Sequence, residues 1–409
     1  MRVNTIRMLD LWMGRPLCAL FTIVAHAGRL LRGRRALPPV RRILFIKLIE
    51  QGATVLMHSA IREAVAKVGR DNVYFCVFEE NRPILDLLGI VPEQNVFTIR
   101  NHRFCAFAMD ALRALSAIRR VGIDATIDME FYSRASALLA YLCGAQRRVG
   151  LHRFTSEAPY RGNLMTHRVQ YNPYLHAAKL CHLLVHALNH DPDDLPLPKT
   201  PAGPLDETVP PFVPTEQERH AAQSMLHELL GTPPQGPIIL LNPNAGDLMP
   251  LRKWPEERFI ALGRRILAEM QNASVILVGD PSERQAAERL RRDIGSPRAV
   301  NAAGRTSLRE LLALYALSDV MITNDSGPAH FASLTEIETV VLFGPETPEL
   351  YGPLGGRCHV LWAGLACSPC MNVLNHRFSP CRNNVCMQSI TVEEAFEEVR
   401  RCLATRKNR

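Results

Sequence analysis

VMITNDSGPAH, residues 320–330, passes from an apolar run of strand length into a polar turn and then into a helix start that contains Pro328. Proline is favoured in the first helical turn because it has no N–H to leave unpaired. The N–H groups and positive dipole end of such a helix form an anion site. Asp325 or Ser326 is placed to cap the helix, and His330 lies one turn in, within reach of a phosphate or sugar hydroxyl. The alternative is an ordinary capped turn.

Strands and helices alternate along most of the chain around this segment. We expect strands over 238–241, 275–278, 320–323 and 339–343, and helices over 256–270, 283–293, 308–317 and 329–334. Nearer the N-terminus we expect strands over 43–48, 73–77, 96–99 and 125–129, and helices over 54–68, 83–88 and 105–120. Near-continuous apolar strands separated by helices are typical of a parallel sheet covered on both faces.

A proline-rich segment, residues 191–214, separates the two alternating halves. It contains eight prolines, so it is neither a helix nor a central strand. The sequence predicts an α/β protein with two doubly wound, Rossmann-like domains that face a central cleft, with ligands beyond the carboxyl ends of the strands. The expected division is a basic, amphipathic membrane-associating segment over 1–40, an acceptor-side domain over 41–190, the linker over 191–214, a nucleotide-sugar-binding domain over 215–390, and a C-terminal helix and tail over 391–409.

The net charge of the 409-residue chain, +8, is carried by its first 42 residues. They contain nine arginines, no lysine and a single acidic residue, Asp10, so the remaining 367 residues sum to zero. A chain with this charge distribution is not basic over its working surface. This argues against a nucleic-acid partner and for a local electrostatic anchor.

An apolar run, residues 16–28, lies between these arginines. It has about 13 residues, whereas a membrane-spanning helix needs roughly 20. The strongest positive cluster follows the run, which is unlike a secretory signal. We therefore expect an interfacial helix on an anionic membrane surface and a cytoplasmic protein peripheral on the inner membrane. A cleaved signal or true anchor and a plain packed helix are the alternatives.

The cysteines include one spaced group. Eleven cysteines are present, and seven are scattered in apolar contexts typical of a reducing compartment. The other four are Cys367, Cys370, Cys381 and Cys386, whose spacing is close to that of a tetrahedral thiolate site. A structural zinc, buried unliganded thiols and disulfides are the alternatives for this group.

Several motifs together resemble glycosyltransferase family 9, the heptosyltransferases of lipopolysaccharide core synthesis, which have the two-domain GT-B fold. They are LNPNAG (241–246) with RKWPEERF (252–259), Val278–Gly279 before Asp280, TNDSGPAH (323–330) with LFGPET (342–347), CSPC (367–370) with Cys386–Met387, and the strand 43–48 with Gly52. The likeness covers roughly residues 43–400 and is most specific in the second half. It leaves residues 1–42 unexplained.

The resemblance implies a site for the nucleotide diphosphate of a sugar donor. The loop Asn324–Pro328, with Asp325, Ser326 and Gly327, and the helix after it would cradle the diphosphate, with His330 as a further donor. Arg252 or Lys253 would supply the compensating cation, and Asn244 lies in the neighbouring motif. Stabilising the charge that grows on the leaving group lowers the barrier most. Members of the family need no catalytic metal, so we expect no cofactor for catalysis.

One residue departs from the family pattern. Members usually carry Asp directly after the glycine of the first turn, and that acid is the expected base, whereas this chain has Ala53 after Gly52. Inversion at the anomeric carbon requires a base for the proton of the acceptor hydroxyl. Glu50, in the same loop, and Glu130, after another strand, are the candidate replacements, and we favour Glu50.

These features predict an inverting, metal-independent transfer of a sugar, with ADP-heptose as the suggested donor, to a lipid-linked oligosaccharide such as the lipopolysaccharide core. Two alternatives remain. The missing acid would permit a nucleotide-sugar-binding protein without transferase activity, and a nucleotide-sugar epimerase shares the GT-B fold. Neither alternative needs a membrane, so the basic N-terminus favours the transferase.

Overall fold

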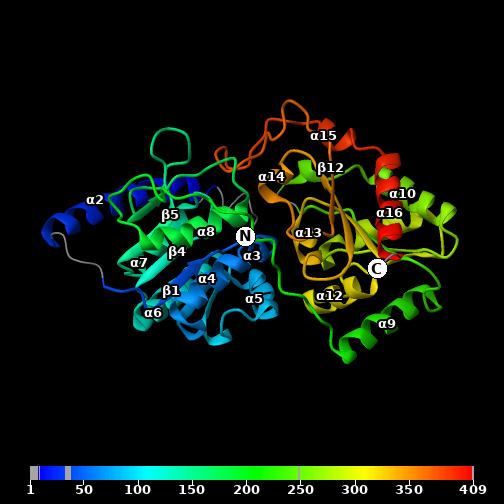
Figure 1. Cartoon of the computed structure of the whole chain (residues 1–409), viewed down its shortest axis with the longest axis horizontal. Helices are drawn as coiled ribbons and strands as arrows, with labels where there is room; N and C mark the ends of the chain where they lie inside the picture. Colours follow the sequence, from blue (N-terminus) through cyan, green and yellow to red (C-terminus); the bar gives the residue numbers. More distant parts are fainter. Residues whose placement is uncertain (1–7, 9, 33–37, 247–248, 408–409) are drawn as a thin grey trace. The chain divides into compact units, whose positions relative to one another are not determined.

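The computed structural model describes residues 8, 10–32, 38–246 and 249–407. The chain forms two compact units, one comprising Met1–Asp206 and Val373–His376, the other Glu207–Asn372 and Arg377–Arg409. The break after Asp206 falls inside the proline-rich segment. Each unit contains a six-stranded sheet with helices around it (Figure 1). The finer division into five segments and the central cleft stay predictions.

The first unit has the strand order β3-β2-β1-β4-β5-β6, with every pair parallel. Its strands are β1 (Ile43–Ile46), β2 (Val73–Phe78), β3 (Val96–Ile99), β4 (Ala125–Asp128), β5 (Arg147–Leu151) and β6 (His167–Val169). Its helices are α2 (Gly14–Arg32), α3 (Gln51–Leu56), α4 (His58–Val68), α5 (Arg82–Leu88), α6 (Phe104–Val121), α7 (Arg134–Leu142) and α8 (Ala177–His186).

Two apolar layers cover this sheet. Alternate side chains of a strand point to opposite faces. Ile43 and Phe45 join the layer formed with α4 and α8, whereas Leu44 and Ile46 join the layer formed with α2, α6 and α7. The central strand is therefore buried on both faces, as its unbroken apolar sequence predicted.

The second unit repeats the topology, with the order β12-β11-β10-β7-β8-β9 and parallel pairing. Its strands are β7 (Ile238–Asn242), β8 (Ser274–Leu277), β9 (Ala299–Asn301), β10 (Val320–Asn324), β11 (Glu338–Phe343) and β12 (Cys358–Trp362). Its helices are α9 (Glu216–Leu230), α10 (Glu256–Glu269), α11 (Arg284–Ile294), α12 (Leu308–Leu317), α13 (Gly327–Ala332), α14 (Pro348–Tyr351), α15 (Val385–Gln388) and α16 (Val392–Lys407). Helices α10, α11 and α16 cover one face.

The predicted fold class, α/β with two doubly wound Rossmann-like sheets, is confirmed. In each sheet the first strand of the unit lies at the centre beside the fourth, so the winding direction reverses there. The expected helix over 54–68 is two helices, α3 and α4, and the expected helix over 329–334 begins earlier, at Gly327. The apolar run over 16–28 lies within α2. No described helix is long and apolar enough to cross a membrane.

Candidate functional site

The candidate residues gather where the winding of each sheet reverses. In the first unit, Lys47 and Glu50 follow β1, and Glu130 follows the adjacent β4. In the second unit, Asn244 follows β7, and Asp325 follows the adjacent β10. Ligands of doubly wound sheets bind at this reversal, beyond the carboxyl ends of the strands. Each unit therefore has its candidate residues at the position that its topology favours for a ligand.

The side chain of Asn324 links three loops of the second unit by hydrogen bonds. Its side chain is fully buried; Oδ1 accepts a hydrogen bond from the backbone N of Trp254 (2.9 Å), and Nδ2 donates to the carbonyls of Pro243 (2.9 Å) and Asn244 (3.3 Å). The amide group thus joins the ends of β7 and β10 to the RKW motif. Its side chain therefore holds three loops in place, and the expected donor contact of Asn324 stays a prediction.

Asp325 and Arg252 form the centre of a buried charge cluster. The Nη1 of Arg252 lies 3.1 Å from Oδ2 of Asp325 and donates to the carbonyl of the same residue at 2.8 Å. Glu346 approaches Arg252 at 3.7 Å, and its other oxygen lies 3.3 Å from Nε of Arg377. Two acids and two arginines therefore balance one another. Sequence reasoning missed Glu346 and Arg377, although Glu346 lies in the quoted LFGPET motif.

Burial raises the pKa of Asp325 to about 6, with Arg252 opposing the shift and Glu346 adding to it. Its carboxylate faces Arg252 instead of capping α13. Ser326 occupies the N-cap position, but its hydroxyl donates to the carbonyl of Asn324 (3.1 Å), and no side chain caps the helix. The prediction that Asp325 or Ser326 caps this helix was therefore wrong. In this short turn, the hydroxyl of Ser326 pairs with the carbonyl at the end of β10 and not with an N–H group of α13.

Lys253 differs from its neighbour Arg252. It is half-buried, and over the described ranges, which omit residues 247–248, no hydrogen bond or ion pair of its ammonium group is found. The side-chain Nδ2 of Asn244 makes long contacts, at 3.4 Å to Oδ1 of Asn242 and 3.5 Å to the carbonyl of Val278. His330 is buried on α13, after Gly327 and Pro328. Among the described residues, Lys253 thus differs from Arg252, whose guanidinium group is paired with Asp325 and Glu346.

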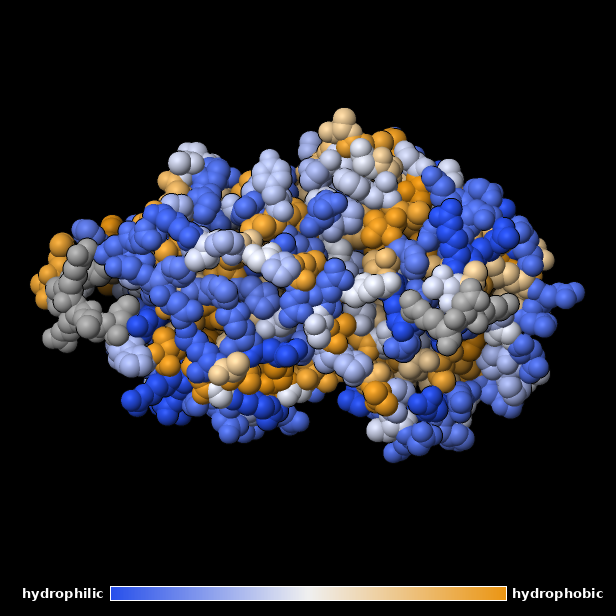
Figure 2. All heavy atoms as spheres, viewed as in Figure 1, coloured by the Kyte–Doolittle hydropathy of each residue, from blue (hydrophilic) through white to orange (hydrophobic). Residues whose placement is uncertain are grey.

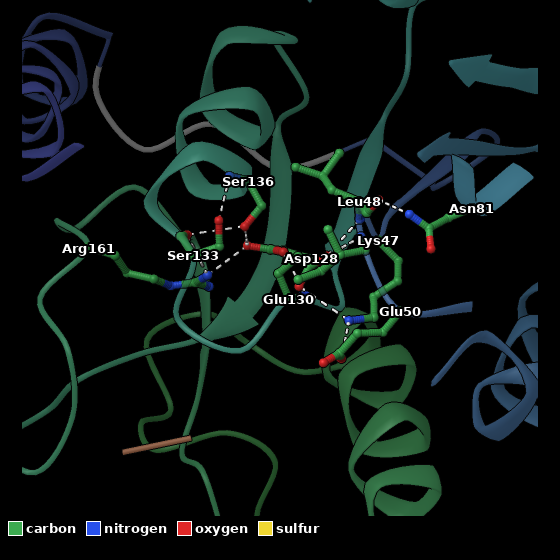
Figure 3. Close-up of polar contacts among 10 residues, drawn as sticks. Lys47, Leu48, Glu50, Asn81, Asp128, Glu130, Ser133, Ser136 and Arg161 are labelled. Carbon is green, nitrogen blue, oxygen red and sulfur yellow. Dashed lines mark hydrogen bonds and ion pairs between the residues drawn. The ribbon is translucent and has the colours of Figure 1, made fainter. Parts of the chain in front are cut away.

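Glu130 holds the loop after β1 in shape (Figure 3). Its Oε1 accepts hydrogen bonds from the backbone N–H groups of Leu48 (2.6 Å) and Ile49 (3.1 Å), and its Oε2 lies 3.2 Å from Nζ of Lys47. Burial raises the pKa of Glu130, and Lys47 opposes that shift. Both carboxylate oxygens of Glu130 are therefore engaged by the protein.

Glu50 lies on the other side of the same lysine. Its Oε2 is 3.3 Å from Nζ of Lys47, and its side chain is 21% exposed, against 7% for Glu130. Its backbone has φ 70°, in the left-handed region, which is unusual for a residue other than glycine. Such conformations persist only where surrounding contacts impose them, and they cluster at functional sites. Of the two candidate bases, Glu50 is the one that solvent reaches.

A second buried ion pair supports the neighbouring strand end. Asp128 has no exposed surface; its Oδ2 lies 2.7 Å from Nη1 of Arg161 and accepts from the hydroxyl of Ser136 (2.9 Å), and its Oδ1 accepts from the backbone N of Glu130 (3.0 Å). Burial raises the pKa of Asp128, and Arg161 opposes the shift. These contacts fix the turn from which Glu130 reaches the β1 loop.

Sequence reasoning missed Lys47, although a lysine within an apolar run signals a buried, paired charge.

The spaced cysteines carry free thiols, as do the other cysteines of the chain. Burial raises the pKa of Cys386, and the neighbouring Cys370, Cys381 and Cys367 contribute in the same direction. Among the described residues, the metal-ligating atoms that lie within 4.8 Å of one another in a group of three belong to Glu338, His359 and Cys402, not to this set. No three of the four spaced thiols therefore lie within 4.8 Å of one another among the described residues.

Residues 111–377, well over half of the chain, match glycosyltransferase family 9 (heptosyltransferase). Lipooligosaccharide heptosyltransferase 2 of Campylobacter jejuni is 31% identical over 102 residues, which cover 25% of this chain and 31% of that protein. The chain thus spans less than a third of the length of this relative.

Two solved structures share the fold. The ADP-heptose lipopolysaccharide heptosyltransferase II of Escherichia coli has a TM-score of 0.66 at 20% identity, covering 90% of this chain and 99% of that one. An E. coli heptosyltransferase solved with ADP-2-deoxy-2-fluoro heptose has a TM-score of 0.59 at 16% identity, covering 88% and 99%. The likeness in fold therefore extends over most of this chain.

Proposed function

Because the chain belongs to glycosyltransferase family 9, we propose that it transfers a sugar from a nucleoside diphosphate to a lipid-linked glycan. We further propose ADP-heptose as the donor and the lipopolysaccharide core as the acceptor. The names of the two similar E. coli structures, one an ADP-heptose transferase and one solved with a fluorinated ADP-heptose, support the donor assignment.

The observation that carries the proposal is the pair of charge clusters at the reversal points of the two sheets. Among the described residues of the second unit's cluster, Arg252 and Arg377 are matched by Asp325 and Glu346, and Lys253 is an additional positive charge beside them. A diphosphate gains negative charge as the sugar departs, and a pre-positioned cation stabilises that charge selectively. Lys253 is therefore the proposed contact for the leaving group, with Arg252 held in place beside it.

The proposed general base is Glu50. In the reaction, the acceptor oxygen attacks the anomeric carbon, the bond from that carbon to the phosphate oxygen breaks, and the hydroxyl proton passes to the carboxylate. Attack from the face opposite the leaving group inverts the anomeric centre. Lys47 contacts the carboxylate of Glu50 and orients it, and Glu130 keeps Lys47 in position. The base thereby replaces the acid that the family pattern places at Ala53.

We propose that charge on the leaving group is balanced by protein cations, without a catalytic metal. A structural metal at Cys367, Cys370, Cys381 and Cys386 stays a prediction, and metal analysis of the purified protein tests it. The proposed location is the cytoplasmic surface of the inner membrane, where a lipid-linked acceptor is available. The basic N-terminal segment supports this location.

Incubation of the protein with ADP-heptose and a heptose-deficient core acceptor tests the proposal. Mass spectrometry should show the acceptor heavier by one heptosyl residue, with no product from UDP- or GDP-sugars. Donor binding without product on any acceptor would instead identify a nucleotide-sugar-binding protein, an outcome that the loss of the family acid at Ala53 makes worth testing.

A further inference from the structure

Helix α2 is firmly packed against the first unit. Cys18 has no exposed surface, and Phe21 contacts Tyr141 of α7 with ring centroids 5.6 Å apart. The hydroxyl of Thr22 accepts a hydrogen bond from the backbone N of Asn163 at 2.8 Å. At Gly162, a Cβ atom would lie only 2.7 Å from the carbonyl of Cys18. One face of α2 is therefore a fixed part of the domain surface.

Asp10, just before α2, strengthens this attachment. Its Oδ1 accepts hydrogen bonds from the backbone N–H groups of Arg134 (3.0 Å) and Ala135 (2.9 Å), the first residues of α7. Its Oδ2 lies 3.0 Å from Nη1 of the buried Arg134. An acidic side chain at a helix start satisfies unpaired N–H groups and the helix dipole. The same helix, α7, begins four residues after Glu130, so α2 is tied to the element that follows the candidate site.

The opposite face of α2 is apolar and exposed. Its residues are related by steps of three, four and seven, which places them on one side of the helix. They are Leu17, Leu20, Ile23, Val24, Leu30 and Leu31, with Trp12 and Met13 just before the helix. Ile23 is 69% exposed, Trp12 71% and Leu31 89%. Figure 2 shows apolar residues, in orange, on the part of the surface where α2 lies. An apolar stripe of this length on a surface marks an interaction site.

The charge of the segment identifies the partner. Nine arginines and one acid lie within the first 42 residues, in a chain that is otherwise neutral. Apolar side chains with an interfacial tryptophan favour the headgroup boundary of a bilayer, and arginines favour its anionic lipids. We propose that the exposed face of α2 binds an anionic phospholipid bilayer and, because the helix is fixed to α7, holds the first unit in one orientation on that surface. The proposal supplies the contact surface for the membrane location proposed above and rests on it.

Co-sedimentation of the full chain with vesicles tests this, in the absence of sugar nucleotide so that a failed transferase assignment does not affect the result. The wild type should bind vesicles of phosphatidylethanolamine and phosphatidylglycerol, and bind phosphatidylcholine vesicles more weakly. The variant I23E should lower the vesicle partition coefficient by about tenfold or more, because a charge must enter the apolar boundary. The matched control is L112E, since Leu112 on α6 is 68% exposed, and this variant should bind like the wild type.

Three outcomes would overturn the proposal. The first is that I23E binds vesicles as well as the wild type does. The second is that L112E loses as much binding as I23E. The third is that the wild type does not bind vesicles, that light scattering shows it to be a dimer, and that I23E is a monomer. The last result would assign the face to a second copy of the chain. The circular dichroism spectrum and thermal unfolding midpoint of I23E without vesicles should equal those of the wild type, which shows that the variant is folded.

Discussion

The Nζ of Lys47 lies 3.2 Å from Oε2 of Glu130, and this buried contact separates the roles of two glutamates. The two carboxylate oxygens of Glu130 contact Lys47 and the backbone of the loop after β1, whereas Glu50 contacts Lys47 from the more exposed side. The first acid organises the loop, and the second is the base that we propose. Substituting Glu130 is therefore expected to affect mainly stability, and substituting Glu50 mainly the reaction rate.

The variant E130Q should lower the stability of the fold more than it lowers the reaction rate. Glutamine keeps an acceptor for the N–H groups of Leu48 and Ile49 but loses the charge that faces buried Lys47, so the free energy of unfolding should fall by about 1–3 kcal/mol. Urea denaturation measures the loss. The maximal rate should fall less in E130Q than in E50Q, and a reversed order would assign the base to Glu130.

The variant K253A should weaken donor binding. Lys253 is half-buried and is the proposed excess cation, so its removal should raise the dissociation constant for ADP-heptose by about tenfold, equivalent to about 1.4 kcal/mol. Calorimetry measures the constant. Conservative K253R should recover part of the affinity, and unchanged binding in K253A would transfer the role to another residue.

Asp325 predicts a pH dependence for the second unit. Its pKa is raised from 3.8 to about 6 on folding, so between these values the folded state holds more protons than the unfolded state. Linkage then requires that this residue's contribution to stability falls as the pH rises from about 4 to 6. The difference in unfolding free energy between the wild type and D325N, measured at pH 4.5 and pH 7, should shrink toward pH 7. A difference that grows with pH would refute the assignment.

Three histidines predict the opposite dependence for the first unit. Burial lowers the pKa of His58, His152 and His167 from 6.5 to about 4. The unfolded state therefore binds more protons between these values, and stability should fall as the pH falls from about 6.5 to 4. Hydrogen exchange at pH 7 and pH 5 should show faster opening of the first unit at pH 5. Replacing His58 with Gln should reduce the effect, and an unaltered response would exclude that residue.

Much of the fold was predictable because its central strands are buried on both faces and have unbroken apolar sequences. The short outer strands β5 and β6 were not predicted, since their arginines and histidine interrupt the apolar pattern. The contacts of Arg252 with Glu346, and of Glu346 with Arg377, join residues far apart in the sequence, and one sequence carries no signal for such pairs. The positions of Glu50 and Asp325 were predictable because strand ends mark the site, but their partners were not.

The most direct test of the central claim, that Glu50 supplies the missing base, is the single-turnover rate of the wild type, E50Q and E50Q/A53D at saturating donor. We predict that E50Q lowers this rate by at least about a hundredfold with donor affinity unchanged, because general-base catalysis typically contributes a factor of this size to the rate. Aspartate at position 53, where the family pattern places its acid, should restore much of the rate. A fully active E50Q, or a double variant as slow as E50Q whose donor binding is intact, would contradict the account.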